Sequence, residues 1–455
     1  MTYIPHTEAE RSEMLKAVGV ARLEDLFAHL PEAVRSPALD APPGLGEMEL
    51  SAELERLASK NRASNELACF LGAGAYDHFI PPAVMELISR GELYTAYTPY
   101  QPEISQGVLQ LIYEYQTMIA TLAGCDVANA SLYDGATALV EGVQMALRQT
   151  GRMGLVLADG AIHPHYLATL RTNLTAMGVK LEVVPPDGGG FESALGALGE
   201  KAAAAGDALA CVAVGYPNFY GAVADLSKFA ELVHGAGALL VASSNPFAFG
   251  VLKPPGKLGA DIVCGEAQAL GVPLQYGGPY LGYVASTAAL VRRMPGRLVG
   301  QTVDVQGRRA FTLTLQAREQ HIRREKATSN ICTNEALCAM MAHFYMSCLG
   351  QRGLERAGEL CLSKADLLRR RLRGLAGTSG AAIKDVPEYA AFHEFVVETR
   401  RPAREVLAGL LKKKILGGLD LGRYDPKRAH EMLVCVTEKR TAAEIEAYVE
   451  ALAVL

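Results

Sequence analysis

The sequence has no C-x-x-C pair among its nine cysteines. Paired cysteines at that spacing mark many zinc sites and thiol redox motifs, so neither class is favoured here. Most of the cysteines lie inside apolar runs, which predicts small buried side chains in a reducing compartment rather than disulfides. We therefore expect no metal site.

The chain also lacks long apolar runs and a large excess of one charge. No stretch reaches the ~18 apolar residues of a membrane span, and the first residues show neither a signal core nor a transit pattern. The 44 basic and 49 acidic residues give a net charge of −5, so the surface has no general attraction for nucleic acid or anionic membranes. We expect a cytoplasmic protein that binds neither.

The length and composition are those of a globular protein with a large core. The 455 residues are 50% hydrophobic and 20% charged, which excludes wholesale disorder. At ~150 residues per domain, the chain has room for two or three domains. Because the first residues are charged and helix-biased, we expect a helical N-terminal arm over 1–64, a large domain over 65–315 and a smaller domain over 316–455.

Short β-rich apolar runs alternate with helical windows after the arm. This alternation predicts an α/β domain with helices packed on a mainly parallel sheet. The expected strands are 154–158, 180–184, 209–214, 238–242, 261–264 and 281–285, and the expected helices include 164–177 and 225–234. After a strand at 311–315, the sequence predicts an α+β domain. Its expected helices are 334–349 and 354–375, and its expected strands are 394–398 and 432–437.

Two features of the large domain could bind a ligand. Asp134 is a good N-cap for a helix, and open backbone N–H groups at a helix start favour an anion such as phosphate. The residues that would offer these groups are Gly135, Ala136 and Thr137. His163 follows the first of the expected strands, where α/β proteins bind ligands, and fits a ring-stacking imidazole. A plain capped helix and a core or capping histidine explain the same residues.

Two loops combine stiffness with hydrogen-bonding groups. The first, over 94–103, contains two prolines and a set of polar side chains. These side chains are Tyr94, Tyr97, Tyr100 and Glu103. The second loop offers neutral donors from Thr328, Ser329 and Asn330 before a helix start. A binding role and a purely structural role, core packing for the first loop and N-capping for the second, both remain open.

Four segments together resemble a known family. They are Phe70-Leu-Gly-Ala-Gly-Ala-Tyr-Asp-His-Phe-Ile-Pro-Pro82, the 94–103 loop, Gly277-Gly-Pro-Tyr-Leu-Gly282 and Arg324-Glu-Lys-Ala-Thr-Ser-Asn-Ile-Cys-Thr-Asn334. The sequence resembles the P-protein of the glycine cleavage system over nearly its whole length, and more closely the subunit 1 (α) group of the split bacterial form. The resemblance implies a fold type I pyridoxal-phosphate (PLP) enzyme, with a large, mainly parallel-sheet domain and a smaller C-terminal domain.

Two positions test whether the chain keeps the chemistry of that fold. A PLP enzyme of this type needs a lysine that forms the Schiff base and an aspartate that pairs with the pyridinium nitrogen. By the resemblance, Ala269 occupies the lysine position and Ala242 the aspartate position. Alanine can form no imine and carries no charge. The chain is therefore predicted to have no catalytic residue of its own, and the Asp134–Thr137 turn and His163 are predicted to be remnants of a cofactor pocket.

The resemblance also implies a partner. Subunit 2 (β) would hold PLP on its own lysine, in a pair of heterodimers, and this chain would complete that active site. The 94–103 loop would face the glycine adduct, and Thr328, Ser329 and Asn330 would donate to the phosphate of the partner's cofactor. The complete enzyme would decarboxylate glycine and pass the aminomethyl group to the lipoyl arm of the H-protein.

Three other interpretations remain open. The chain could be a purely structural or regulatory partner with no residue in the active site. It could be a self-sufficient PLP decarboxylase with a displaced lysine, for which Lys253 and Lys257 are the nearest candidates. It could also belong to a related PLP decarboxylase that acts on a larger amino acid.

Overall fold

The structure is a computed structural model that describes residues 6–35, 41–63, 66–95, 98–185 and 191–455. Contacts divide the chain into two units, Met1–Arg62 and Ala63–Leu455. Within the described residues, no helix is both long and apolar enough to cross a membrane.

The N-terminal unit is helical. Its α-helices are α1 (Glu8–Val18) and α2 (Glu47–Ala58), with short 3-10 turns at Leu23–Phe27 and Glu32–Val34. Thr7 and Glu10 form a capping box that satisfies backbone N–H groups at the start of α1. None of the described residues of this unit is buried, so its helices have no core of their own.

The second unit is built on a seven-stranded sheet in the order β2-β8-β7-β6-β5-β3-β4. The strands are β2 (Val127–Ala128), β3 (Leu155–Asp159), β4 (Lys180–Val184), β5 (Leu209–Gly215), β6 (Leu239–Ser243), β7 (Ile262–Glu266) and β8 (Gly282–Ser286). Strands β3 to β7 are parallel, while β8 and β2 are antiparallel to their neighbours. The predicted α/β class is confirmed. β8 reverses direction because a loop without a helix joins it to β7, and such a connection does not cross back over the sheet.

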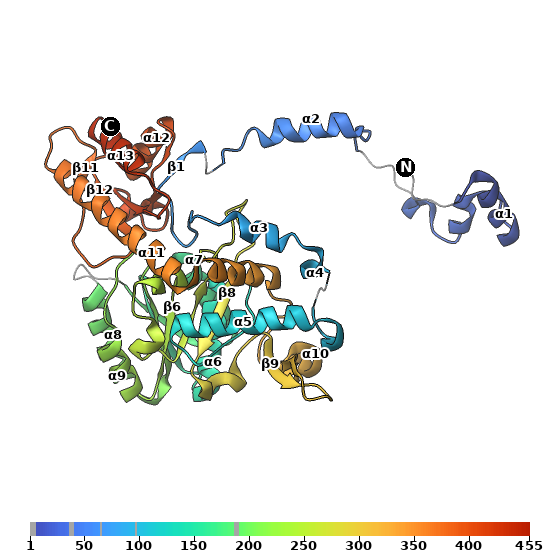
Figure 1. Cartoon of the computed structure of the whole chain (residues 1–455), viewed down its shortest axis with the longest axis horizontal. Coiled ribbons are helices and arrows are strands. Elements are labelled where there is room, and N and C mark those ends of the chain that lie inside the picture. Colours follow the sequence, from blue (N-terminus) through green and yellow to red (C-terminus); the bar gives the residue numbers. More distant parts are fainter. Residues whose placement is uncertain (1–5, 36–40, 64–65, 96–97, 186–190) are drawn as a thin grey trace. The chain divides into compact units, whose positions relative to one another are not determined.

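Helices cover both faces of this sheet. One face packs against α6 (Gly135–Thr150) and α7 (Pro164–Ala176). The other face packs against α5 (Gln106–Ala123), α8 (Phe191–Ala205), α9 (Ser227–Gly235) and the first half of α11 (Ala336–Ala376), and α5 and α11 lie side by side in Figure 1. From Cys211 to Val214, successive residues of β5 alternate between the two cores, as the two-residue period of a strand requires.

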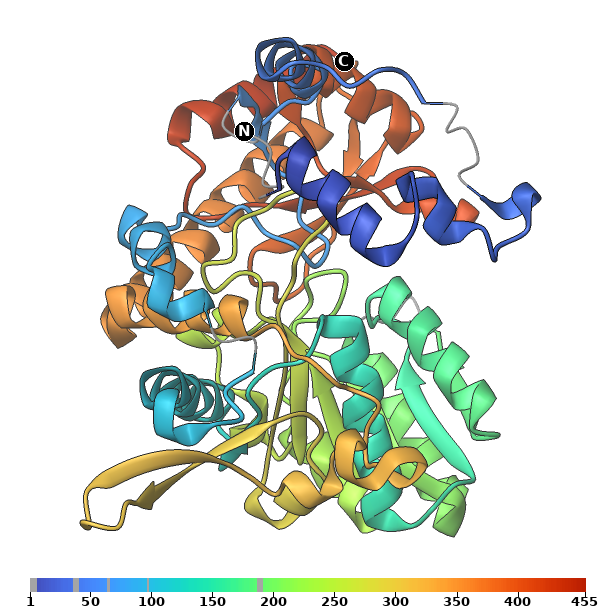
Figure 2. The ribbon, with the colours of Figure 1, turned by 90° about the vertical axis from the view of Figure 1, so that its right-hand side faces the viewer.

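The C-terminal part has its own antiparallel sheet, drawn in orange to red in Figure 2. Its strands are β11 (Ile383–Asp385), β12 (Glu394–Thr399), β15 (Glu431–Cys435) and β14 (Leu419–Asp420), and they pack with α12 (Ala403–Lys412) and α13 (Ala442–Ala453). The helix α11 that leads into it contains a non-helical residue, Gly350, between the two helices predicted from the sequence. A hairpin of β9 (Leu298–Val303) and β10 (Arg309–Thr314) precedes α11.

The segment 70–82 connects the two sheets. It follows β1 (Ala68–Cys69), which pairs in parallel with β13 (Ile415–Leu416), and it leads into α3 (Pro82–Ile88) and α4 (Gly91–Tyr94). Tyr76 exchanges two hydrogen bonds with Gln268, just beyond β7, while Ala73 N–H donates to Glu394 of β12. This segment therefore fixes the C-terminal sheet against the carboxyl edge of the central sheet.

Candidate functional site

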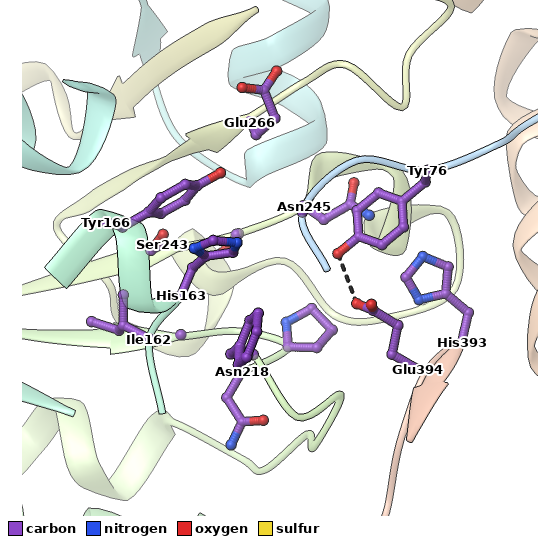
Figure 3. A pocket seen from close by; sticks show the side chains of 15 residues that line it. Tyr76, Ile162, His163, Tyr166, Asn218, Ser243, Asn245, Glu266, His393 and Glu394 are labelled. Carbon is purple, nitrogen blue, oxygen red and sulfur yellow. Dashed lines mark hydrogen bonds between the residues drawn. The ribbon is translucent and has the colours of Figure 1, made fainter. Parts of the chain in front are cut away.

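A cavity of about 60 Å³ lies at the carboxyl ends of the parallel strands, between them and the C-terminal sheet. Figure 3 shows its side chains, which come from the 70–82 segment, the start of α7, the ends of β6 and β7, and β12. This edge is where α/β folds bind ligands. Pockets that hold a drug-sized ligand usually measure ~300–1,000 Å³, so this cavity is too small for a cofactor.

His163 is the N-cap of α7, which begins with Pro164. Its Nε2 donates to the Ala73 carbonyl at 3.0 Å, and its Nδ1 accepts from the His165 N–H at 3.1 Å. Burial lowers the pKa of His163 to about 4, so the ring is neutral. The Tyr166 ring stacks on it at a centroid distance of 4.7 Å. The imidazole thus acts as a cap and stacks on a ring of its own chain.

The start of α6 is a closed capping box. Asp134 accepts from the Thr137 N–H at 2.7 Å, and the Thr137 hydroxyl accepts from the Asp134 N–H at 3.2 Å. The Gly135 N–H donates to Glu266 Oε2 at 3.0 Å. The backbone groups that the sequence suggested for an anion are therefore engaged within the chain at both Gly135 and Thr137.

Glu266 is a site residue that the sequence interpretation missed. It ends β7 and accepts three backbone N–H groups, from Gly135 at 3.0 Å, Gln268 at 2.9 Å and Leu281 at 2.8 Å. Burial raises the pKa of Glu266 to about 7, against the lowering effect of these donors. A carboxylate just beyond a run of buried apolar residues was the available signal, because such a group needs partners.

A second buried carboxylate faces the same cavity. Glu394 accepts from the Ala73 N–H at 2.6 Å and from the Tyr76 hydroxyl at 2.7 Å, the dashed line in Figure 3. Burial raises the pKa of Glu394 to about 7. Tyr76 and Glu394 belong to segments more than 300 residues apart, so only the folded chain brings them together.

The residues of the cavity do not fit a PLP cofactor. Ala242 and Ala269 are both buried, and among the described residues that line the cavity there is neither a lysine nor an aspartate. Lys253 and Lys257 are not part of that lining. With no imine-forming amine, alanine at the position of the aspartate that pairs with the pyridinium nitrogen, and too little volume, the cavity cannot hold PLP as a Schiff base.

Ala269 is not part of that lining but lines a neighbouring cavity of about 270 Å³. Beside it, three possible metal-ligand atoms, from His78, Cys361 and Glu438, lie within 4.8 Å of one another. The His78 Nδ1 to Glu438 Oε2 distance is 2.7 Å, and the Cys361 Sγ to Glu438 Oε2 distance is 3.3 Å. Two ligand atoms of a tetrahedral zinc lie roughly 3.3 Å apart, given bonds of about 2 Å. The closer pair has the distance of a hydrogen bond, and the cluster is explained as an ion pair with a thiol donor.

The two loops singled out in the sequence meet in one hydrogen-bond network. Arg297 donates to the Tyr100 hydroxyl at 3.0 Å and to Asn334 Oδ1 at 3.1 Å. Asn334 in turn donates to the Ser131 hydroxyl at 2.7 Å, just before α6. Arg297 is 5% exposed, and its guanidinium also lies over the Tyr100 ring. The network therefore holds the aromatic loop, the 324–334 segment and the approach to α6 together.

The individual residues of these loops differ in exposure. Tyr94, Tyr100 and Glu103 are exposed on the first loop, whereas Tyr97 lies outside the described residues. In the second loop, the structure places the three donors at different depths. Asn330 is exposed, Thr328 is half-buried, and Ser329 is buried.

Ser329 makes its contacts within the chain. Its hydroxyl accepts from the Ile331 N–H at 3.0 Å and hydrogen-bonds the buried Glu141 of α6. Ser329 thus has a structural role here, while Thr328 and Asn330 have more open surface.

The fold places the chain in the class of fold type I PLP-dependent enzymes. The alanine–glyoxylate aminotransferase from Nostoc sp. shares this fold, with a TM-score of 0.57 at 15% identity over 85% of this chain and 94% of that one. A crystal structure of the inhibitor-bound glycine decarboxylase (P-protein) of the glycine cleavage system is far more similar. It has a TM-score of 0.88 at 47% identity, and both chains are fully covered.

Sequence comparison identifies the family within that class. The family described as "Glycine cleavage system P-protein" matches residues 1–452. The "Probable glycine dehydrogenase (decarboxylating) subunit 1" of Desulforamulus reducens is 50% identical over 448 residues, 98% of each chain. The chain belongs to the glycine cleavage system P-protein family, as its motifs predicted.

Proposed function

We propose that this chain is the non-lysine-bearing subunit of a two-subunit P-protein and that it completes an active site held by subunit 2. One observation carries the proposal: the cavity at the carboxyl ends of the parallel strands is too small for a cofactor and has no lysine in its lining. A chain of this fold that cannot form the imine needs a partner that can. The name of the D. reducens relative, subunit 1, implies such a second subunit.

The proposed reaction is that of the family. The complete enzyme would decarboxylate glycine and transfer the aminomethyl group to the lipoyl arm of the H-protein, in a pair of heterodimers in the cytoplasm. Pyridoxal phosphate, bound by the partner, would supply the electron sink for the decarboxylation. This chain would supply positioning groups and a wall that excludes water.

The polar side chains of the 94–103 loop are our candidates for contact with the partner's glycine site. Tyr94, Tyr97 and Tyr100 carry phenol donors, and Glu103 carries a carboxylate that can accept from an ammonium group. The Arg297 contact supports this assignment, because a loop fixed by a buried guanidinium presents its side chains with little loss of conformational entropy.

The 328–330 segment is our candidate for contact with the phosphate of the partner's cofactor. Thr328, Ser329 and Asn330 would act as neutral donors at the interface. The Thr328 N–H donates to the Arg318 carbonyl at 3.1 Å, which holds the segment in place. Of the three, Thr328 and Asn330 have the open surface that a contact across an interface needs.

Co-expression with subunit 2 tests this proposal. Glycine-dependent exchange of labelled carbon dioxide should be absent with either chain alone and present when both are combined. Turnover of glycine by the isolated chain would contradict it and would favour a displaced lysine. Reduction with borohydride followed by peptide mapping would then show whether Lys253 or Lys257 had bound the coenzyme.

A purely structural or regulatory role is the second candidate. The buried network of Arg297, Asn334 and Ser131 gives that alternative a specific basis, because it explains the two loops without a ligand. Unchanged turnover after alanine substitution of Tyr94 and Glu103 in the assembled complex would favour this role. Substrate profiling of the same complex would identify a preference for a larger amino acid.

A further inference from the structure

In this chain, the backbone N–H groups around the start of α6, where a phosphate could bind, are occupied by the side chain of Glu266. Three backbone N–H groups converge on Glu266 from three segments: the start of α6, the turn after β7 and the approach to β8. Convergent N–H groups at a helix start form the usual cradle for a phosphate or another anion. Here the anion is a carboxylate that belongs to the chain and is 7% exposed.

A tethered anion competes strongly with a free one. Because Glu266 is the last residue of β7, the fold itself holds its carboxyl group at the start of α6, whereas a free ligand must be bound from solution. A phosphate would have to displace three hydrogen bonds and leave Glu266 in a buried site without partners. A buried carboxyl group that loses its partners destabilises the folded chain, so this exchange is unfavourable.

The space above the helix start is also filled. A Cβ atom built on Gly135 would lie 2.2 Å from the Tyr166 hydroxyl oxygen and 2.9 Å from Glu266 Cβ. Tyr166 is held there by its stack on His163. Figure 3 shows Tyr166 between His163 and Glu266. The ring therefore blocks the approach to the N–H groups from the cavity side.

The charges of the cavity oppose an anion as well. Its described lining includes two buried carboxyl groups, Glu266 and Glu394, and no lysine or arginine. Asp134 adds a third carboxyl group close to Glu266. His163 has its donor committed to the Ala73 carbonyl. No charged group in this lining would compensate a phosphate.

We propose that Glu266 is a built-in substitute for the phosphate of a cofactor and that it shuts PLP and free phosphate out of this chain. This inference goes beyond the proposed function, since it concerns only the chain's own cavity. It gives the structural reason why one subunit of the pair would bind no coenzyme even when the coenzyme is abundant.

Binding to the isolated full-length chain tests the inference. The probes are inorganic phosphate and pyridoxine 5′-phosphate, which has no aldehyde to react with surface lysines. Isothermal titration should show no saturable binding of either probe to the wild-type chain. Saturable one-to-one binding that Glu266→Ala abolishes would overturn the proposal.

Three variants sharpen the test. Glu266→Ala should gain affinity for phosphate of roughly tenfold or more, seen also as a phosphate-dependent rise in Tm. Glu394→Gln, which removes the other cavity carboxyl, should gain less than twofold, because Glu266 still occupies the three N–H groups. Tyr166→Ala opens the space but keeps Glu266, so it should still exclude phosphate.

Two results would contradict the role proposed for Glu266. A folded Glu266→Ala chain without any gain, or a Tyr166→Ala chain that binds phosphate, would show that Glu266 is not what excludes the anion. Should Glu266→Ala fail to fold, the wild-type and Tyr166→Ala titrations still decide. Because none of these measurements involves glycine turnover or subunit 2, their failure is distinguishable from failure of the proposed function.

Discussion

At the scale of single residues, the cavity is organised by buried carboxyl groups. Glu266 is held by backbone donors alone, whereas Glu394 is held by one backbone donor and the Tyr76 hydroxyl. Burial raises the pKa of both groups to about 7. The folded state therefore favours the protonated form of each group more than the unfolded state does.

Replacing Glu394 with Gln should change the pH dependence of stability. In the wild-type chain the folded state binds more protons at this position than the unfolded state between pH 4.5 and about 7, so the free energy of unfolding falls as pH rises through that range. Glu394→Gln keeps the shape and cannot titrate. Relative to this variant, the wild-type chain should lose up to about 3 kcal/mol between pH 4.5 and 7. Urea unfolding at several pH values measures the difference, and parallel curves for both chains would contradict the prediction.

The Tyr100 hydroxyl should matter for activity through its contact with Arg297. Tyr100→Phe removes the acceptor for a buried guanidinium and loosens the loop, so we expect turnover of the assembled complex to fall roughly tenfold, which corresponds to about 1.4 kcal/mol. Tyr424→Phe, on the C-terminal part of the chain, is the matched control and should leave turnover unchanged. Equal turnover with both variants would show that the Tyr100–Arg297 contact of the 94–103 loop does not contribute to activity.

At the scale of secondary-structure elements, the sequence patterns predicted several strands and helices of five residues or more to within a residue or two. β4 begins and ends at the predicted residues, and α7 differs from its prediction by one residue. The two-residue strands β1, β2, β13 and β14 were not predicted, because two residues carry no periodicity. Such pairings form only when tertiary contacts bring the segments together.

Gly350 interrupts α11 with a φ of 59° and a ψ of −178°, a conformation that glycine adopts far more readily than other residues. A Cβ atom there would meet nothing within 4 Å, so the cost of Gly350→Ala comes from the backbone alone. We expect a loss of about 1–2 kcal/mol in the free energy of unfolding.

Gly374 provides the matched control in the same helix. It has ordinary helical geometry and equally open surroundings, so Gly374→Ala should stabilise the chain by roughly 0.5–1 kcal/mol. Urea unfolding compares the two variants. Equal effects would mean that the interruption at Gly350 does not depend on glycine.

At the scale of the whole second unit, the 70–82 segment joins the central and C-terminal sheets through buried charges. Asp77 accepts from Arg440 at 3.2 Å and from Lys439 at 2.5 Å, and both Asp77 and Arg440 are buried. His78 pairs with Glu438 in the same region, which lowers the pKa of Glu438 to about 2 against the effect of burial. These pairs link residues more than 350 positions apart.

Removing Asp77 should therefore destabilise the whole unit. Asp77→Ala leaves the buried Arg440 without one of its two carboxylate partners, and we expect a loss of about 3 kcal/mol. Asp366→Ala breaks an exposed pair with Arg370 on α11 and should cost less than about 1 kcal/mol. Chemical denaturation measures both, and equal losses would show that the bridge contributes no more than a surface pair.

The alternation of apolar runs with helical windows was enough to predict the α/β class, and four motifs were enough to predict the family, since both depend on local pattern. The two alanines, Ala242 and Ala269, led by resemblance to the prediction that the chain has no Schiff-base lysine of its own. The roles of Glu266, Glu394 and Arg297 could not be assigned that way, because each has a partner between 131 and 321 positions away in the sequence. A buried charge is stabilised by whichever groups the fold brings within about 3 Å of it, and only the packed chain decides which groups those are.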